Sequence, residues 1–211
     1  MRRKRIQTIG AILTLALLVT GCANSGTEQR EDGEYQTIEL TMAVNGTDNQ
    51  IDARVGDYFA QLVSERSGGN VTVAVFPNDQ LANGNASRGI EMIASGSIDL
   101  AAYATCTLAV IDEKLPVATI PWIFDDYAQA REVIDTTGGE YYAQRLAMKG
   151  MTYLGSFHNG FRQITNSRHE VTTPADMENL KIRVPGSVVY MGFFRALGPD
   201  PTSINWSEVF T

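Results

Sequence analysis

Short apolar segments with two different periodicities follow one another along the chain from residue 38 onward. Apolar residues at alternate positions or in short runs predict strands, whereas apolar residues three or four positions apart predict helices. In the first half of the chain, strands are predicted over 38–45, 71–78 and 98–104, and helices over 51–66 and 86–94. Because the strands alternate with helices and the third is almost wholly apolar, the pattern predicts an α/β fold with mainly parallel sheets.

The second half continues this alternation less regularly. Residues 115–124 contain two prolines and are predicted to cross between parts of the fold, bringing Trp122 and Phe124 against the core or a cleft. Residues 127–148 have helical spacing with one interruption at Gly138-Gly139. The remaining predicted elements are strands over 151–158 and 161–167, separated by a tight turn at Asn159-Gly160, a strand over 180–185, a helix over 188–197 and a strand over 201–204.

The N-terminus has the pattern of a secretion signal. Four basic residues at positions 2–5 precede an apolar run over 9–19, which is too short for the roughly 20 residues that cross a bilayer as a helix. Val19-Thr20-Gly21-Cys22 then resembles a bacterial lipobox, in which the cysteine is lipidated and becomes the mature N-terminus. The alternative is an ordinary signal with an incidental cysteine. Residues 1–21 are therefore predicted to be a lipoprotein signal peptide, and the polar residues 22–37 a flexible tether.

The charge of the chain argues against nucleic acid as a partner. The 211 residues include 17 basic and 24 acidic ones, a formal net charge of −7. Without the four basic residues of the signal, 13 basic residues remain against 24 acidic ones, a net charge of −11. An acidic surface repels phosphates, so binding to nucleic acid without regard to sequence is not expected.

Sequence signatures of catalysis are missing. The chain has no phosphate-binding loop, no GxGxxG after a strand, no GxSxG and no Cys-His spacing typical of a metal site. The two histidines, His158 and His169, would need carboxylates for a zinc site, and the spacing indicates none. Cys106 is the one cysteine besides Cys22, so it makes no disulfide within the mature chain and is predicted to be a small buried hydrophobe. We therefore expect no enzyme, no metal and no cofactor.

Two arginines stand among apolar strand residues, Arg162 in NGFRQITNSR and Arg183 in LKIRVPGS. A guanidinium presents a fixed fork of donors that fits a carboxylate, and it stays charged at any relevant pH. Arg183 also lies near the carboxyl end of its strand, where open α/β sheets place their ligands. The alternatives are a solvent-facing arginine, on the face opposite Ile182 and Val184, or an arginine that braces the fold. The pair is compatible with a site for an organic acid, and Arg183 is the stronger candidate.

Six segments in a fixed order resemble one family of transport proteins. They are PNDQLANG, GSIDLA, IPWIFDDYAQA, NGFRQITNSR, PADMENLKIRVPGS and ALGPDPTSINWSEVFT. In this order they are similar to the solute-binding subunits of tripartite ATP-independent periplasmic (TRAP) transporters, of the DctP type, over residues 38–211. The resemblance implies a two-lobed, periplasmic-binding-protein-like α/β fold that closes on its ligand. Residues 38–158 would form the first lobe, and residues 159–211 the start of the second.

The resemblance also implies which residues contact the ligand. The carboxylate-binding arginine of the family lies in the motif LKxRxP, which matches Arg183, and a second arginine in an NGxRQ-type stretch matches Arg162. By the same matching, Asn45, Thr105 and Trp206 line the cleft.

This chain departs from the family pattern in two places. After Gln80-Leu81 the family usually has a small residue and then charged ones, whereas Ala82-Asn83-Gly84-Asn85-Ala86 stands here, so no ligand contact is assigned to that loop. Family members also continue well beyond the stretch that ends at Thr211. We therefore expect a fold truncated at its C-terminus, with both lobes incomplete.

The function implied by the resemblance is capture of a small organic acid outside the cytoplasmic membrane. The protein would be lipid-anchored through Cys22 and would deliver the acid to TRAP membrane permease subunits driven by an ion gradient. Two alternatives belong to other classes. One is a secreted enzyme on a similar scaffold, for which the sequence offers no paired acid and base. The other is a sensory module that binds an organic acid on behalf of a receptor.

Overall fold

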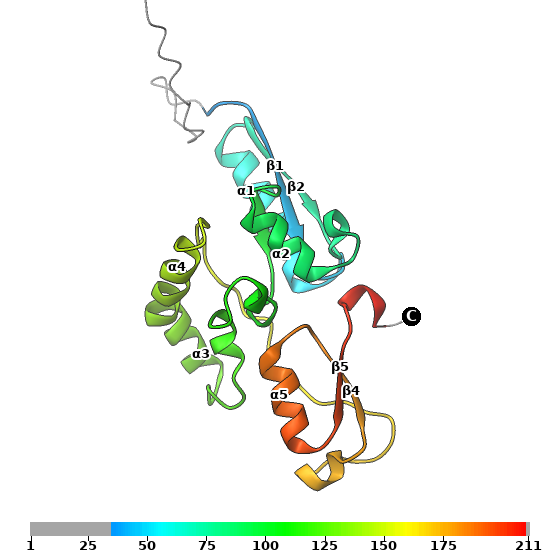
Figure 1. The fold of residues 1–211 in the computed structure, drawn as a ribbon. Coiled ribbons are helices and arrows are strands. Elements are labelled where there is room, and N and C mark those ends of the chain that lie inside the picture. Colours follow the sequence, from blue (N-terminus) through cyan, green and yellow to red (C-terminus); the bar gives the residue numbers. More distant parts are fainter. Residues whose placement is uncertain (1–34, 210–211) are drawn as a thin grey trace, which may run out of the picture.

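The computed structural model describes residues 35–209 (Figure 1). The predicted signal peptide, Cys22 and most of the predicted tether lie outside the described residues. Within 35–209, no helix has both the length and the apolar character needed to cross a membrane. The strands are β1 (Ile38–Val44), β2 (Val71–Phe76), β3 (Leu100–Ala102), β4 (Lys181–Val184) and β5 (Asp200–Ser203). The α-helices are α1 (Ile51–Arg66), α2 (Ala86–Ala94), α3 (Tyr127–Val133), α4 (Gly139–Ala147) and α5 (Val188–Leu197). Shorter helical turns are η1 (Gln80–Ala82), η2 (Thr105–Val110), η3 (Leu115–Thr119), η4 (Ile134–Gly138), η5 (Pro174–Met177) and η6 (Trp206–Glu208).

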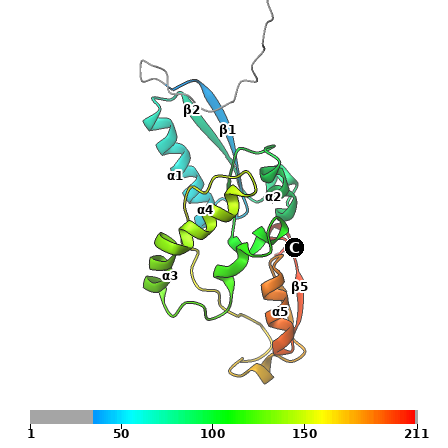
Figure 2. The ribbon, with the colours of Figure 1, turned by 60° about the vertical axis from the view of Figure 1, so that its left-hand side comes forward.

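The first sheet brings the carboxyl ends of three parallel strands to one edge. The strand order is β2-β1-β3, and Met42 in the central strand pairs with Val75 on one side and Leu100 on the other. The buried half of β1 packs on α1 through Met42, Val44 and Ala53, and Figure 2 shows α1 running alongside β1 and β2. The predicted parallel sheet is confirmed, and α1 and α2 have the predicted bounds.

The helical region from residue 127 to residue 147 is bent by a π-turn. In this turn, η4, Thr136 has a non-helical backbone with φ −125° and ψ −112°. A Cβ at Gly138 would lie 2.8 Å from the carbonyl oxygen of Val133, and one at Gly139 would lie 2.6 Å from that of Ile134. The interruption therefore begins earlier than the predicted Gly138-Gly139. The two glycines permit it, because only a residue without Cβ fits against those carbonyl groups.

Helix α4 contacts the end of the segment that runs from η2 to η3 through a hydrogen bond and an ion pair. The Tyr142 hydroxyl donates a hydrogen bond to the Leu115 carbonyl oxygen at 2.9 Å, and Arg145 forms an ion pair with Asp112. Tyr142 and Leu115 are both fully buried. These contacts fix the segment that carries Thr105.

The strands predicted over 151–158 and 161–167 are not formed. This segment forms no ladder with any other part of residues 35–209, and residues 154–170 are exposed throughout. The Asn159-Gly160 dipeptide does bend the chain, since Gly160 has φ +82° and its N–H donates to His158 Nδ1 at 3.1 Å. The prediction is wrong because alternation specifies which face a strand would bury, whereas a strand also needs a neighbour that supplies hydrogen bonds.

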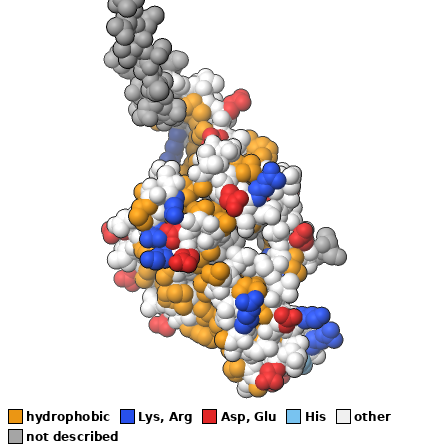
Figure 3. Space-filling view, in the orientation of Figure 1, with side chains coloured by type: hydrophobic (Ala, Val, Ile, Leu, Met, Phe, Trp, Pro, Cys, Tyr) orange, Lys and Arg blue, Asp and Glu red, His pale blue; other side chains and the backbone are white. Residues whose placement is uncertain are grey.

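Trp122 does not pack against the core, so the first of the two predicted placements is wrong. Its side chain is 83% exposed and meets the ring of Phe193 edge-on, with 5.4 Å between ring centroids. The predicted crossing segment folds instead into the turn η3, and the left-handed backbone of Trp122 (φ 58°) redirects the chain. Phe124 is half-buried. On the face shown in Figure 3, hydrophobic side chains also gather around α3.

The second sheet consists of the parallel strands β4 and β5, with Arg183 opposite Thr202. Parallel neighbours require a crossover connection, which α5 provides. This helix begins at Ser187, whose side chain accepts a hydrogen bond from the Tyr190 N–H, and it ends at Gly198 in the left-handed conformation. The core of this part consists of Met177, Val184 and Phe194. The predicted strand over 180–185 and helix over 188–197 are confirmed, and β5 begins one residue before its predicted start.

Candidate functional site

Arg183 is half-buried on β4 and holds the segment after β5. The predicted alternation is seen at the ends of this strand, where Lys181 is exposed and Val184 is buried, while Ile182 and Arg183 are both half-buried. Arg183 Nε and Nη2 donate hydrogen bonds to the Ile204 carbonyl oxygen at 3.0 and 2.6 Å. Its guanidinium carbon lies 5.3 Å from the ring centroid of Trp206, a cation–π distance. Arg183 is thus neither free in solvent nor neutralised by these contacts, because its hydrogen bonds go to an uncharged carbonyl group.

A second guanidinium, that of Arg162, lies against helix α5. Arg162 belongs to the exposed extended segment, and its guanidinium carbon lies 4.7 Å from the ring centroid of Tyr190 on α5. The pKa of Arg183 is lowered, chiefly by burial and then by the positive charge of Arg162. Two like charges held near one another cost free energy, and a bound anion would relieve that cost.

Cys106 lies within electrostatic range of both arginines. Its thiol is 2% exposed, and burial raises its pKa while the charges of Arg162 and Arg183 partly oppose the rise. The prediction of a small buried hydrophobe is therefore confirmed. Cys106 follows Thr105 in η2.

The Thr105 side chain lies near the hydroxyl of Tyr142. This contact opposes the rise in the pKa of Tyr142 that burial causes. Thr105 is half-buried. Its place in a ligand cleft stays a prediction.

Asn45 lies just after β1 and belongs to a polar network that the sequence analysis did not find. Its Nδ2 donates to Asp79 Oδ2 at 2.6 Å, and the hydroxyl of Tyr103 donates to Asp79 Oδ1, also at 2.6 Å. Asp79 is 1% exposed. Burial raises the pKa of this carboxyl, while the hydrogen bonds from Tyr103 and Asn45 oppose the rise. Burial and the neighbouring Asp79 also raise the pKa of Tyr103.

Arg183 and the Asn45 network meet through the segment after β5. Ser207, next to Trp206, donates to the carbonyl oxygen of Gly84 at 3.2 Å. Gly84 belongs to the loop that follows Asp79, in the stretch where this chain departs from the family pattern. In Figures 1 and 2, η6 lies beside the end of the first sheet. Three of the residues predicted from separate segments, Asn45, Arg183 and Trp206, are thus connected through Asp79, Gly84 and Ser207. Arg162 contacts Tyr190 on α5 instead.

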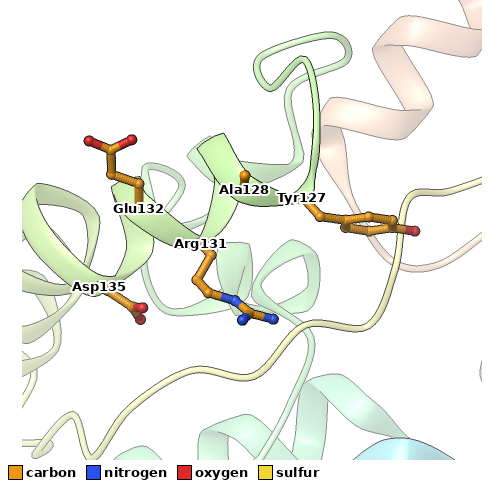
Figure 4. Close-up of a pocket in the computed structure, with 5 residues that line it drawn as sticks. All are labelled: Tyr127, Ala128, Arg131, Glu132 and Asp135. Atoms are coloured by element: carbon orange, nitrogen blue, oxygen red, sulfur yellow. The ribbon is translucent and has the colours of Figure 1, made fainter.

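A surface hollow lies on α3 and the start of η4. It is lined by Tyr127, Ala128, Arg131, Glu132 and Asp135. Figure 4 shows Glu132 pointing away from Arg131 and Asp135, so the three charges do not converge. This hollow is shallow and open, and nothing in its lining matches a small-molecule site with converging polar groups.

Neither histidine of the chain takes part in a metal-binding group. Among residues 35–209, no three His, Cys, Asp or Glu side chains lie together in a way that would hold a metal ion. His158 stacks edge-on against Tyr127, with ring centroids 4.7 Å apart. His169 Nε2 shares a hydrogen bond with the carbonyl oxygen of Asp176 at 2.7 Å.

Comparison with known proteins gives the family. The model of the DctP family, described as bacterial extracellular solute-binding protein, family 7, matches residues 42–211. The chain belongs to this family. The predicted identity as a TRAP-type solute-binding subunit of the DctP type is thereby confirmed.

Individual DctP relatives agree with this assignment. The 2,3-diketo-L-gulonate-binding periplasmic protein YiaO of Escherichia coli (strain K12) is 31% identical over 199 residues, 94% of this chain and 58% of YiaO. The C4-dicarboxylate-binding protein DctB of Bacillus subtilis (strain 168) is 30% identical over 152 residues, 72% of this chain and 43% of DctB. The chain thus spans about half the length of these relatives.

A solved DctP-type structure confirms the predicted fold class. The TRAP periplasmic solute-binding protein from Ralstonia eutropha H16, with bound (S)-2-acetolactate, matches with a TM-score of 0.77 and 28% identity. The match covers 81% of this chain and 54% of that chain. The lobe boundary at residues 158 and 159 and the ligand-binding roles of the five residues remain predictions.

Proposed function

We propose that this DctP-family chain captures a small organic acid outside the cytoplasmic membrane and holds its carboxylate with Arg183 and Arg162. The observation that carries the proposal is the placement of two guanidinium groups on aromatic rings, Arg183 at 5.3 Å from Trp206 and Arg162 at 4.7 Å from Tyr190 on α5, the helix that follows β4. The hydrogen bonds of Arg183 to Ile204 leave its charge unneutralised. A carboxylate would accept from the remaining N–H groups and offset part of the two positive charges.

The remaining predicted residues complete the proposed site. Trp206 offers an aromatic face beside Arg183, while Thr105 and Asn45 lie at the carboxyl ends of the first sheet, where parallel sheets place ligands. The chain would act by binding alone, with no catalytic step and no cofactor.

Calorimetric titration of the protein expressed from its complete gene tests the proposal. The titrants are D-galactonate, D-erythronate and succinate, with Arg183→Ala as the test variant and Lys181→Ala as the control. Lys181 lies on the same strand but is exposed. We expect at least one acid to bind, to be recovered unchanged, and to lose affinity only in Arg183→Ala. Equal affinity in both variants would contradict the proposed role of Arg183.

Delivery to a permease and attachment by a lipid on Cys22 are the further parts of the proposal. The support for delivery is membership of a family whose solved relatives include TRAP periplasmic proteins. Uptake of a labelled acid by cells with and without the gene tests this part. A module that serves a receptor would bind the acid equally well, but its removal would leave uptake unchanged.

A further inference from the structure

The amide of Asn45 is held in one orientation by a buried carboxylate. Both oxygens of Asp79 accept hydrogen bonds, one from Tyr103 and one from Asn45, each at 2.6 Å. A carboxylate that accepts on both oxygens requires the nitrogen of the Asn45 amide to face it. The amide oxygen, Oδ1, is then directed away from Asp79 and is available as an acceptor.

The backbone around Asp79 fixes this orientation further. The N–H of Asp79 donates to the Val44 carbonyl oxygen at 3.0 Å. The N–H of Asn78 donates to the Gly46 carbonyl oxygen at 2.7 Å. Tyr103 has no room to move toward α2, because even a Cβ at Gly89 would lie 2.2 Å from its hydroxyl oxygen. The network is therefore rigid, and Asn45 is not free to turn its amide over for different ligands.

The proposed site has two parts of opposite charge, one at the arginines and one at Asn45. The arginine end carries Arg162 and Arg183, whereas Asp79 lies beneath Asn45, and Asp52 is near enough to raise the pKa of Asp79 further. The two parts are linked by direct contacts. Arg183 lies against Trp206, the neighbouring Ser207 donates a hydrogen bond to the Gly84 carbonyl oxygen at 3.2 Å, and the Gly84 N–H donates to the Asp79 carbonyl oxygen at 3.0 Å. An acid held by its carboxylate at the arginines would thus extend toward an acceptor oxygen in a negative field. A hydroxyl group can donate to that oxygen, whereas a second carboxylate can only accept and is repelled.

We propose that Asp79 and Tyr103 position Asn45 to accept a hydrogen bond from a ligand hydroxyl, so that the site selects hydroxylated monocarboxylates over dicarboxylates. The inference rests on the proposed function. It names the chemical class of acid within the function, namely aldonates and similar hydroxy acids. Asp79 and Tyr103 act as positioning residues, and Asn45 is the group that contacts the ligand.

Two matched pairs of acids test the selectivity. D-galactonate and galactarate share six carbons and their inner hydroxyls and differ only in that a terminal CH2OH is a carboxylate in galactarate. D-erythronate and meso-tartrate form the corresponding pair with four carbons. In calorimetric titrations of the protein expressed from its complete gene, we expect the aldonate of at least one pair to bind at least about tenfold more tightly than its diacid. Tighter binding of the diacid in both pairs, or of succinate over every aldonate, would overturn the inference and leave the proposed function intact. Failure of all the acids to bind would overturn both.

Variants of the network test the positioning role. Asp79→Asn removes the charge beneath Asn45, and Tyr103→Phe removes one hydrogen bond with a smaller change in shape. We expect each to reduce the ratio of aldonate to diacid affinity by about fivefold or more, because selectivity depends on the held amide. Glu91→Gln, an exposed acid on α2, is the control and should leave the ratio unchanged. A variant that only loosened the fold would lower both affinities by a similar factor. An unchanged ratio in both network variants would therefore overturn the positioning role.

Discussion

Replacement of Arg183 by alanine should weaken the fold and the binding of acid together. The variant loses two hydrogen bonds from a charged donor group to the Ile204 carbonyl oxygen, at 3.0 and 2.6 Å. Hydrogen bonds of charged groups contribute about 1.5 to 3 kcal/mol, and the contact with Trp206 adds about 0.5 to 1 kcal/mol. Because the two bonds share one acceptor, we expect a total loss of about 2 to 3 kcal/mol in the free energy of unfolding.

The effect on binding has a separate origin. Arg183→Lys keeps the positive charge but lacks the fork, so it should bind an acid at least about tenfold more weakly, which corresponds to about 1.4 kcal/mol. Arg183→Ala should bind more weakly still. In stability the lysine variant should fall between the parent and alanine, since an ammonium group can donate to the Ile204 carbonyl oxygen but cannot make both bonds.

Thermal melting without ligand and calorimetric titration with D-galactonate measure the two effects. For a protein of this size a loss of 1 kcal/mol lowers the melting midpoint by about 2 to 4 °C. Lys181→Ala, at an exposed position of the same strand, should change neither the melting midpoint nor the affinity. Unchanged affinity with a lowered midpoint in Arg183→Ala would make the arginine a structural brace alone. An unchanged midpoint would refute the stabilising contribution of its contact with Ile204.

Three further predictions concern other parts of the chain. Cys22→Ser should move the protein from the membrane fraction to the soluble fraction on cell fractionation, and retention in the membrane would refute lipidation at this residue. Gly89→Ala should lower the free energy of unfolding by about 1 to 3 kcal/mol despite the helix preference of alanine, because its Cβ would meet the Tyr103 hydroxyl. Combined with Tyr103→Phe, it should cost less than the sum of the two single variants in denaturant unfolding, and strict additivity would contradict the clash. Hydrogen bonds from two backbone N–H groups lower the pKa of Asp176 to about 2, so its stabilisation should be full above about pH 4 and lost as the pH falls through 2. The melting midpoint of Asp176→Ala should therefore lie below that of the parent at neutral pH and converge with it near pH 2, whereas a constant difference would refute this role.

Elements with strong local signals were predictable from the sequence. The helix over 86–94 begins after Asn85, whose side chain accepts from the Arg88 N–H, and the helix over 188–197 has a cap at each end. Such caps act within a few residues, so they are visible in the sequence as neighbouring letters. The parallel sheets followed from apolar strands that alternate with these helices.

The errors arose where structure depends on a distant partner. Residues 151–167 alternate as a strand would, but a strand forms only where another strand lies beside it. The bend in the helical region came earlier than predicted because Gly138 and Gly139 make room for carbonyl groups of the preceding turn. The two glycines therefore permit a bend that begins four residues before Gly138, at Ile134.

The candidate site was predictable only in part, for the same reason. Arg183 and Trp206 were matched through a continuous motif and lie in contact. The Asp79 network joins residues that are 34 and 24 positions apart, and no motif or periodicity connects them. One local signal did exist. Asp79 follows Asn78 after a proline, and both adopt the left-handed backbone that asparagine and aspartate tolerate best, so a fixed turn could have been expected there.

The geometry divides affinity and selectivity between two parts of the proposed site. Arg162 and Arg183 would meet the carboxylate that every candidate acid carries, so changes there should lower all affinities by a similar factor. Asn45 would meet the part of the ligand in which the acids differ, and its orientation depends on a buried carboxylate rather than on the arginines. Arginine variants should therefore leave the ratio of aldonate to diacid affinity nearly constant, while Asp79 variants should change that ratio. This separation is possible because Arg183 lies in the second sheet and Asn45 follows a strand of the first, and each sheet has its own core.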